Sequence, residues 1–242
     1  MTAQTDLLTA EYPDISHIIT EDDTPVDNIF SEKQQKLLTR SLSSSWNPGR
    51  PFIAASDVGI FIAVHQPPVV PDMFLSLDVQ CAEDIWKKKN RSYFLWEFGK
   101  PPEVAVEIVS NTKGGESTVK IGKYAQAGVW YYIIFDPQRL IQKDVLRMYE
   151  LYAGQYIPIV GNRLPRIGLG VTLWEGCFEG IQTRWLRWSD HKGKLIETGE
   201  ERAEKAEQRN LDTAHRMLAD GLEPEIVMKY TGLSLEEITC LM

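Results

Sequence analysis

The sequence predicts an α/β (α+β) protein with a mixed β-sheet flanked by helices, followed by a helical C-terminal tail. Between residues 52 and 136, short runs of β-branched and aromatic residues are separated by Pro, Gly and Asn, which is typical of strands joined by turns. A strand, a helix and another strand follow one another around residues 104–136, which predicts one parallel pair within the sheet. From about residue 197 the composition shifts to Glu, Ala, Arg and Lys, as in an exposed helix.

The composition is that of an ordinary globular protein. With 242 residues, 43% of them hydrophobic and 25% charged, the chain is long enough for one main domain with appendages. We expect a polar N-terminal arm over residues 1–26, the main domain over residues 27–190 and the helical tail over residues 191–242. A formal net charge of −8 argues against a general nucleic-acid coat protein, because phosphate neutralisation requires cations.

The sequence also bears on where the protein works. It contains no run of eighteen apolar residues, and its first residues lack the basic and apolar regions of a secretory signal, so we expect no membrane association. The three cysteines, Cys81, Cys177 and Cys240, are far apart and lack metal-type pairing, which favours a reducing compartment. We therefore expect a cytoplasmic protein.

The individual elements follow from periodicity and turn residues. A first helix is expected over residues 31–45, begun by a capping box of Ser31 and Gln34, and a second over residues 116–128, ended by Gly128. A hairpin is expected to turn at Ala153 and Gly154. Strands are expected within residues 52–64, 69–79, 93–98, 103–110, 129–136 and 166–176.

The tail predicts two short helices, over residues 223–230 and 234–241, broken at Gly232. A helix, a short turn with Gly and another helix form either a small DNA-binding unit or a docking unit. The acidic residues of this segment would oppose phosphate, so the sequence favours an interaction or packing module.

One residue interrupts an otherwise apolar strand. In "VAVEIV", a run typical of a strand buried on both faces, Glu107 stands in the middle. An unpaired carboxylate there would cost several kcal/mol or take up a proton. Asp72, in "VVPDMFL", is a second acid where burial is expected, and Lys120 follows the strand by one loop. The three side chains are therefore candidates for one site.

Two interpretations of these residues stay open on the pattern alone. Asp72 and Glu107 would bind a hard divalent cation such as Mg²⁺ or Mn²⁺, while Lys120 orients a water or stabilises phosphate oxygens during hydrolysis of a phosphodiester. In the structural interpretation, Glu107 forms a buried salt bridge with Lys120, and Asp72 caps a turn without any metal.

An ordered set of motifs favours the first interpretation. The succession "VVPDMFL", "PPEVAVEIVS", Glu116, Lys120 and Tyr124 at four-residue steps, and "AGVWYYIIFDP" resembles the Uma-two family of restriction endonucleases, within the PD-(D/E)XK nuclease superfamily. The resemblance covers roughly residues 27–180 and implies a restriction-endonuclease-like nuclease fold for the main domain, residues 27–190. It implies that Asp72 is the acid of the PD motif, Glu107 the (D/E) acid and Lys120 a lysine supplied by the helix. It further implies a metal contact from the carbonyl of Ile108.

The sequence departs from the superfamily pattern at the residue two after the glutamate. Val109 stands where a lysine is usual, so Lys120 would have to reach the site from the helix. Glu103 and Glu116 occupy positions where the family often has aspartate, and both keep the charge. Glu103 is a candidate support for the site or ligand of a second metal, and Glu116 a favourable charge at the helix start. Tyr124 is expected to pack or to hydrogen-bond a site residue.

Basic residues that would contact DNA are also predicted. Lys113, in the turn before the second helix, is placed to touch a phosphate. The segment "KKKNR" beside Trp86 has the basic and aromatic character of a strand-binding surface, and its basic residues are Lys87, Lys88, Lys89 and Arg91. The alternative is a solvated loop whose aromatic neighbours pack into the core.

The function predicted from all of these features is a Mg²⁺-dependent endodeoxyribonuclease. Its partner would be DNA, and a homodimer is expected because enzymes that cut both strands usually pair two copies. The alternative function is a non-catalytic binding or scaffold protein that retains the nuclease fold.

Overall fold

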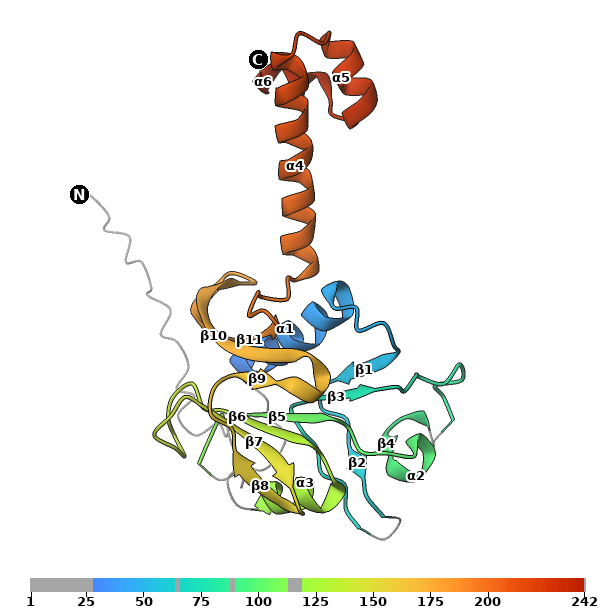
Figure 1. The fold of residues 1–242 in the computed structure, drawn as a ribbon, viewed down its shortest axis with the longest axis vertical. Coiled ribbons are helices and arrows are strands. Elements are labelled where there is room, and N and C mark those ends of the chain that lie inside the picture. The colour runs from blue at the N-terminus through green and yellow to red at the C-terminus, as the bar shows by residue number, and fades with distance from the viewer. Residues whose placement is uncertain (1–27, 64–65, 88–89, 113–118, 242) are drawn as a thin grey trace, which may run out of the picture.

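A six-stranded sheet lies at the centre of the molecule in the computed structural model, which describes residues 28–63, 66–87, 90–112 and 119–241 (Figure 1). Its order is β1-β3-β5-β6-β7-β8, with β5 and β6 parallel and every other neighbouring pair antiparallel. The strands are β1 (Phe52–Ala55), β3 (Met73–Leu77), β5 (Val104–Ile108), β6 (Tyr131–Phe135), β7 (Leu146–Tyr152) and β8 (Gln155–Pro158). The mixed sheet with one parallel pair is thus confirmed.

One face of this sheet packs against a helix and a second sheet. The helix is α1 (Ile29–Ser45), and the second sheet consists of β9 (Arg163–Leu164), β10 (Leu169–Phe178) and β11 (Ile181–Asp190), with a short 3-10 helix, η3 (Pro165–Ile167), after β9. Leu38 of α1, Val106 of β5 and Trp188 of β11 lie in one buried apolar cluster. The even-numbered residues of β5 therefore face α1.

The opposite face of the sheet packs against shorter elements. These are α3 (Ile121–Ala127), α2 (Leu95–Phe98) and a two-stranded parallel sheet of β2 (Ile60–Phe61) and β4 (Tyr93–Phe94). Ala105 of β5 and Val109, which directly follows the strand, share a buried cluster with Tyr124 of α3. Since alternate residues of a strand share a face, Glu107 lies on this same side, beneath α3.

The C-terminal helices project away from the sheets. α4 (Gly199–Ala219) rises from the body of the molecule and holds α5 (Pro224–Thr231) and α6 (Leu235–Leu241) at its far end (Figure 1). A capping box starts α4, with Thr198 and Glu201 bonding each other's backbone N–H groups. Val227, Leu233 and Ile238 pack against Ala214 of α4 in a small separate core. We call α4 the stalk, α5 and α6 the head, and the rest the body.

Several predicted elements differ from the observed ones. The first helix is capped by Asn28, whose side chain accepts from the N–H of Ser31, so the predicted capping box of Ser31 and Gln34 is wrong. Residues 93–98 form only two residues of strand before α2, because Gly99 closes a helical turn there. The predicted arm, residues 1–26, lies outside the described residues.

Other expectations hold. The hairpin turns at Ala153 and Gly154, which both have positive φ, and the break between the two tail helices falls at Gly232. Trp185 and Trp188 are fully buried. None of the described helices is both long and apolar enough to span a bilayer.

Candidate active site

The sheet register brings the two predicted acids together. Met73 of β3 lies opposite Val106 of β5 in an antiparallel pair, so extending the register by one residue sets Asp72 opposite Glu107. Residues directly opposite each other share a face, with Cβ atoms about 5 Å apart. The site therefore lies where β3 begins and β5 ends.

Glu107 is fully buried, and both of its carboxylate oxygens accept hydrogen bonds. The hydroxyl of Tyr124 donates to Oε1 at 2.6 Å, and the ammonium of Lys120 donates to Oε2 at 2.7 Å. Lys120 stands directly before α3 and Tyr124 follows four residues later, so both side chains lie on the helix face above the strand. The Lys120 side chain remains 27% exposed, which leaves its ammonium accessible from solvent.

Asp72 is held by a backbone group and by a side chain that the sequence did not single out. Its Oδ2 accepts from the N–H of Ile108 at 2.5 Å, and its Oδ1 lies 3.4 Å from the amide nitrogen of Gln35. Gln35 is a buried residue of α1, and the same nitrogen donates to Asp57 at 3.0 Å. Gln35 reaches Asp72 because α1 packs against the sheets, so no local sequence motif identifies Gln35 as a site residue.

The electrostatics of the site are dominated by the two acids. Burial raises the pKa of Glu107 well above its usual value, and the nearby carboxylate of Asp72 raises it further, against the opposing effect of Lys120. Burial, followed by the charge of Glu107, also raises the pKa of Tyr124. The tyrosine hydroxyl consequently stays protonated and acts as a donor to Glu107. Among the described residues, two acids and the ammonium of Lys120 thus meet in this site.

The donor atoms fit a hard divalent cation. Asp72 and Glu107 offer carboxylate oxygens, and each such oxygen can accept beyond the one bond described above. In a strand, the N–H and C=O of one residue point to the same side, so the carbonyl of Ile108 faces the side where its N–H bonds Asp72. No three Asp, Glu, His or Cys side chains group as a metal site within the described residues. Mg²⁺ needs no more than one or two carboxylates, because it retains several waters.

A comparison with known protein families shows which family the chain belongs to. Residues 9–168, more than half of the chain, match the family model Uma2, described as "Putative restriction endonuclease". The chain belongs to the Uma2 family. The resemblance seen in the sequence motifs is thereby confirmed, and the chain is related to restriction-endonuclease-like nucleases.

A second match lies outside the Uma2 region. Residues 207–242, the end of the stalk and the head, match the "C-terminal HTH domain" of the Rpn/YhgA-like nuclease family. Within this unit the break at Gly232 separates α5 from α6. The sequence favoured a packing module for this segment, whereas the match favours the helix-turn-helix alternative.

The chain was also compared with solved structures and with curated proteins. A putative nuclease belonging to DUF820 from Anabaena variabilis ATCC 29413 has a crystal structure that matches with 16% identity and a TM-score of 0.39, over 55% of this chain and 69% of that chain. No curated protein matches the sequence significantly.

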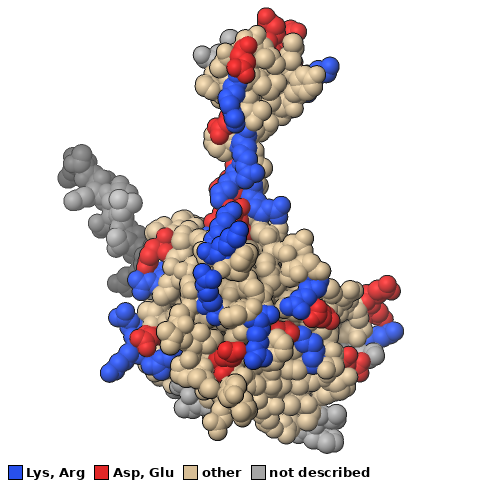
Figure 2. All heavy atoms as spheres, viewed as in Figure 1, with Lys and Arg blue, Asp and Glu red and all other residues tan. Residues whose placement is uncertain are grey.

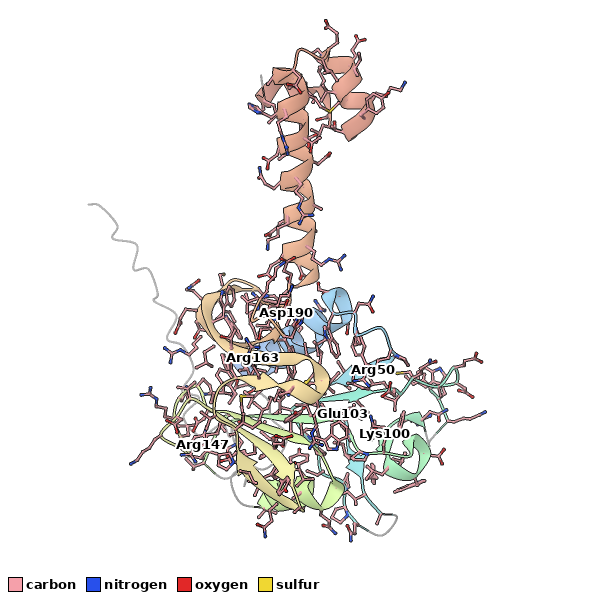
Figure 3. All side chains as sticks on the ribbon, viewed as in Figure 1. Arg50, Lys100, Glu103, Arg147, Arg163 and Asp190 are labelled. Carbon is pink, nitrogen blue, oxygen red and sulfur yellow. The ribbon has the colours of Figure 1, made fainter. Side chains whose placement is uncertain are left out.

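Within the Uma2 region, Glu103 lies apart from the acid pair. It stands just before β5, four residues and about 13 Å along the strand from Glu107. Its carboxylate accepts from the N–H of Leu77 at 2.8 Å and from the ammonium of Lys100 (Figure 3 labels both charged partners). Glu103 therefore joins β3 to β5 at the other end of the pairing, and its geometry does not suit a ligand of the same metal.

The predicted DNA-binding residues are also separated from the acids. Lys87 and Arg91 are exposed on the loop that leaves β3 at Leu77, the end of that strand farthest from Asp72. Trp86 beside them is 77% exposed, so the alternative that this aromatic residue packs into the core is wrong. Lys88, Lys89, Lys113 and Glu116 lie outside the described residues.

Proposed function

We propose that the protein is a metal-dependent endonuclease that hydrolyses DNA phosphodiester bonds at Asp72, Glu107 and Lys120. The observation that supports this most directly is the buried Glu107, held beside a second carboxylate in a strand of a Uma2-family sheet. A salt bridge that served only the fold would need Lys120 and Glu107 but not the repulsive Asp72. The acid pair, by contrast, is what a divalent cation requires.

Each residue has a distinct role in this proposal. Asp72, Glu107 and the carbonyl of Ile108 hold Mg²⁺ or Mn²⁺, which when bound would lower the pKa of a water and offset phosphate charge. Lys120 donates to a phosphate oxygen or to the attacking water, since its ammonium is partly exposed beside Glu107. Tyr124 and Gln35 orient the two carboxylates through the hydrogen bonds described above.

The substrate and assembly belong to the same proposal. A helix-turn-helix match in a nuclease-family chain supports DNA as the substrate. Cutting both strands would use two copies of the site, which a homodimer supplies. The exposed, free cysteines of the described chain suit a reducing compartment such as the cytoplasm.

The first test is metal binding and cleavage with matched variants. Calorimetric titration of Mg²⁺ and Mn²⁺ should give saturable binding that is lost in Glu107→Gln. Nicking of supercoiled DNA should require the metal and should fall at least about 100-fold in Glu107→Gln and in Lys120→Ala, because each removes a group acting on the reacting phosphate. Circular dichroism should show that both variants remain folded.

Two control variants separate loss of the site from general damage. Glu103→Gln changes a buried carboxylate next to the same strand, and Lys123→Ala changes a lysine on the same helix. Both should retain cleavage within about threefold, since neither side chain reaches the acid pair. If a folded parent binds no divalent cation even with DNA present, the scaffold alternative replaces the nuclease proposal.

A further inference from the structure

The stalk has its positive charges on one side. All four Lys and Arg residues of α4 fall within a stripe about 60° wide, because they are spaced by three, four and seven residues at 100° per residue. They are Arg202, Lys205, Arg209 and Arg216, and all four side chains are exposed. We call this set the basic stripe.

Three of the five acids of the stalk lie on the other side of the helix. By the same spacing, Glu200, Glu204 and Glu207 fall on the side opposite the basic stripe. Glu201 and Asp212 flank one edge of the stripe, at i,i+4 spacing from Lys205 and Arg216, and Glu201 is also bonded to Arg187 of the body. The stripe, with four cations and one flanking acid that is not bonded to the body, therefore keeps an excess of positive charge.

The cations of the stripe make only local contacts that leave donors available. Lys205 pairs with Glu197 at 2.7 Å but stays 55% exposed. The guanidinium groups of Arg202 and Arg216 donate to the backbone carbonyls of Ser44 and Asp212. A guanidinium has five N–H donors, so each arginine can still bind a phosphate in two-pronged geometry.

The stripe lies between the two parts of the molecule that the proposed function assigns to DNA. Figure 2 shows Lys and Arg side chains along the stalk and onto the body, and Figure 3 places Arg163 on the body below the start of α4. From Arg202 to Arg216 the helix rises about 21 Å, the length of about six base pairs. Duplex DNA that reached both the head and the body would run beside this length of helix.

We propose that the basic stripe binds the phosphate backbone of duplex DNA and aligns the duplex along the stalk. The inference rests on the proposed function for its choice of partner, and on the separation of charge along α4 for its location. Contacts of this kind position a duplex without reading its sequence. The stripe would therefore contribute to affinity on every DNA sequence equally.

The test is the salt dependence of DNA binding by the full chain. Binding of a fluorescent 30-base-pair duplex of random sequence is measured by anisotropy in EDTA across a KCl series. The double variant Arg209→Gln, Arg216→Gln should reduce the slope of log K against log[KCl] by about 1.8, or about 0.9 for each lost phosphate contact. At 0.1 M KCl that change corresponds to binding about 60-fold weaker, when affinity at 1 M is unchanged.

Two controls isolate the stripe. The double variant Glu204→Gln, Glu207→Gln alters the same number of charges on the opposite side of the same helix, and Arg50→Gln removes an exposed arginine of the body. Both should keep the parental slope. Glutamine is a good helix former, so circular dichroism should show unchanged helix content in every variant.

Three results would overturn the inference. They are an unchanged slope in the Arg209, Arg216 variant, a parent that does not bind duplex DNA at low salt, and conversion of a dimer to a monomer by that variant, which would make a second copy the occupant. Failure of the nuclease proposal looks different. A parent that binds DNA through the stripe but cuts nothing with Mg²⁺ or Mn²⁺ leaves the stripe in place and removes the catalytic assignment.

Discussion

Glu107 has to accommodate a negative charge in a fully buried position beside Asp72, and this makes its protonation depend on pH. Its folded-state pKa lies well above the value near 4.3 of an unfolded chain. A group whose pKa is raised by folding stabilises the protein below the unfolded value, and that contribution disappears as pH rises through the folded value. Without metal, the parent should therefore lose stability as pH rises from about 4 through this raised pKa.

Comparison with Glu107→Gln measures this effect. Glutamine has no charge to bury, so in EDTA the variant should become more stable relative to the parent as pH rises, by about 1 kcal/mol or more over this interval. Urea unfolding at several pH values gives the difference. Excess Mg²⁺ should reverse the trend in the parent alone, because cation binding to the carboxylate form stabilises the folded state.

A role of Gln35 in positioning Asp72 can be predicted from the structure but not from the sequence. Its amide nitrogen links Asp57 and Asp72, so Gln35→Ala should leave Asp72 less well oriented and weaken Mg²⁺ binding about tenfold. Gln34→Ala is the matched control, since this neighbouring buried glutamine bonds the backbone of Leu186 at both ends of its amide. Gln34→Ala should lower stability yet leave metal affinity unchanged. Equal metal affinity in both variants would exclude the positioning role of Gln35.

At the scale of elements, the sequence predicts best what local pattern determines. The apolar run around Glu107, the helical spacing of Lys120 and Tyr124, and the parallel neighbour of β5 were all evident from periodicity. These features suffice to bring a lysine and a tyrosine over the strand glutamate. The pairing of Asp72 with Glu107 depends on the β3–β5 register, which the motif order suggested only through family resemblance.

Elements that depend on distant contacts were missed. The strand predicted within residues 166–176 corresponds to β10, the first of two ten-residue strands that pair antiparallel, with Val171 opposite Trp188. The second strand, β11, was not predicted because its Arg and Trp residues lack an alternating pattern. The position of Asn28 as the cap of α1 was also missed, since a nearby serine fits the capping pattern equally well. The role of Gln35 was not predicted for a related reason, because its hydrogen-bond partners Asp57 and Asp72 lie outside α1.

At the scale of the whole molecule, the stalk separates a helix-turn-helix head from a nuclease-family body. Residues 202–209 of α4 are all exposed, whereas Leu211, Met217 and Leu218 farther along pack around the buried Ala214 against the head. A helical segment that is polar all round serves as a bridge between folded parts. The direction of the stalk is consequently set by its attachment to the body, close to Glu201.

That attachment centres on Arg187 of β11, which is only 2% exposed. Its guanidinium donates to both carboxylate oxygens of Glu201, at 2.7 and 2.6 Å, and lies 4.7 Å from the ring centre of Trp174. Burial opposes ionisation of Glu201, but the bonds from Arg187 and from the N–H of Thr198 hold its pKa below the usual value. The pair therefore stabilises the protein above pH 4 to 5, and the stabilisation is lost as pH falls.

Removing Glu201 leaves the buried guanidinium without its counter-charge, so Glu201→Ala should cost about 2–3 kcal/mol of stability at pH 7. Arg187→Met should lower stability by less, because it removes the buried charge itself. The carboxylate of Glu201 that remains is partly exposed, so water can solvate it. Glu200→Ala, one residue away and exposed, serves as the control and should stay within about 0.5 kcal/mol of the parent. Urea unfolding gives all three values, and the loss of stability in Glu201→Ala should be smaller at pH 4.

Small-angle scattering should also show a wider range of head-to-body distances in Glu201→Ala, since the Arg187–Glu201 ion pair that directs the stalk is gone. An unchanged scattering profile would mean that Arg202 and α1 suffice to fix the direction of the stalk.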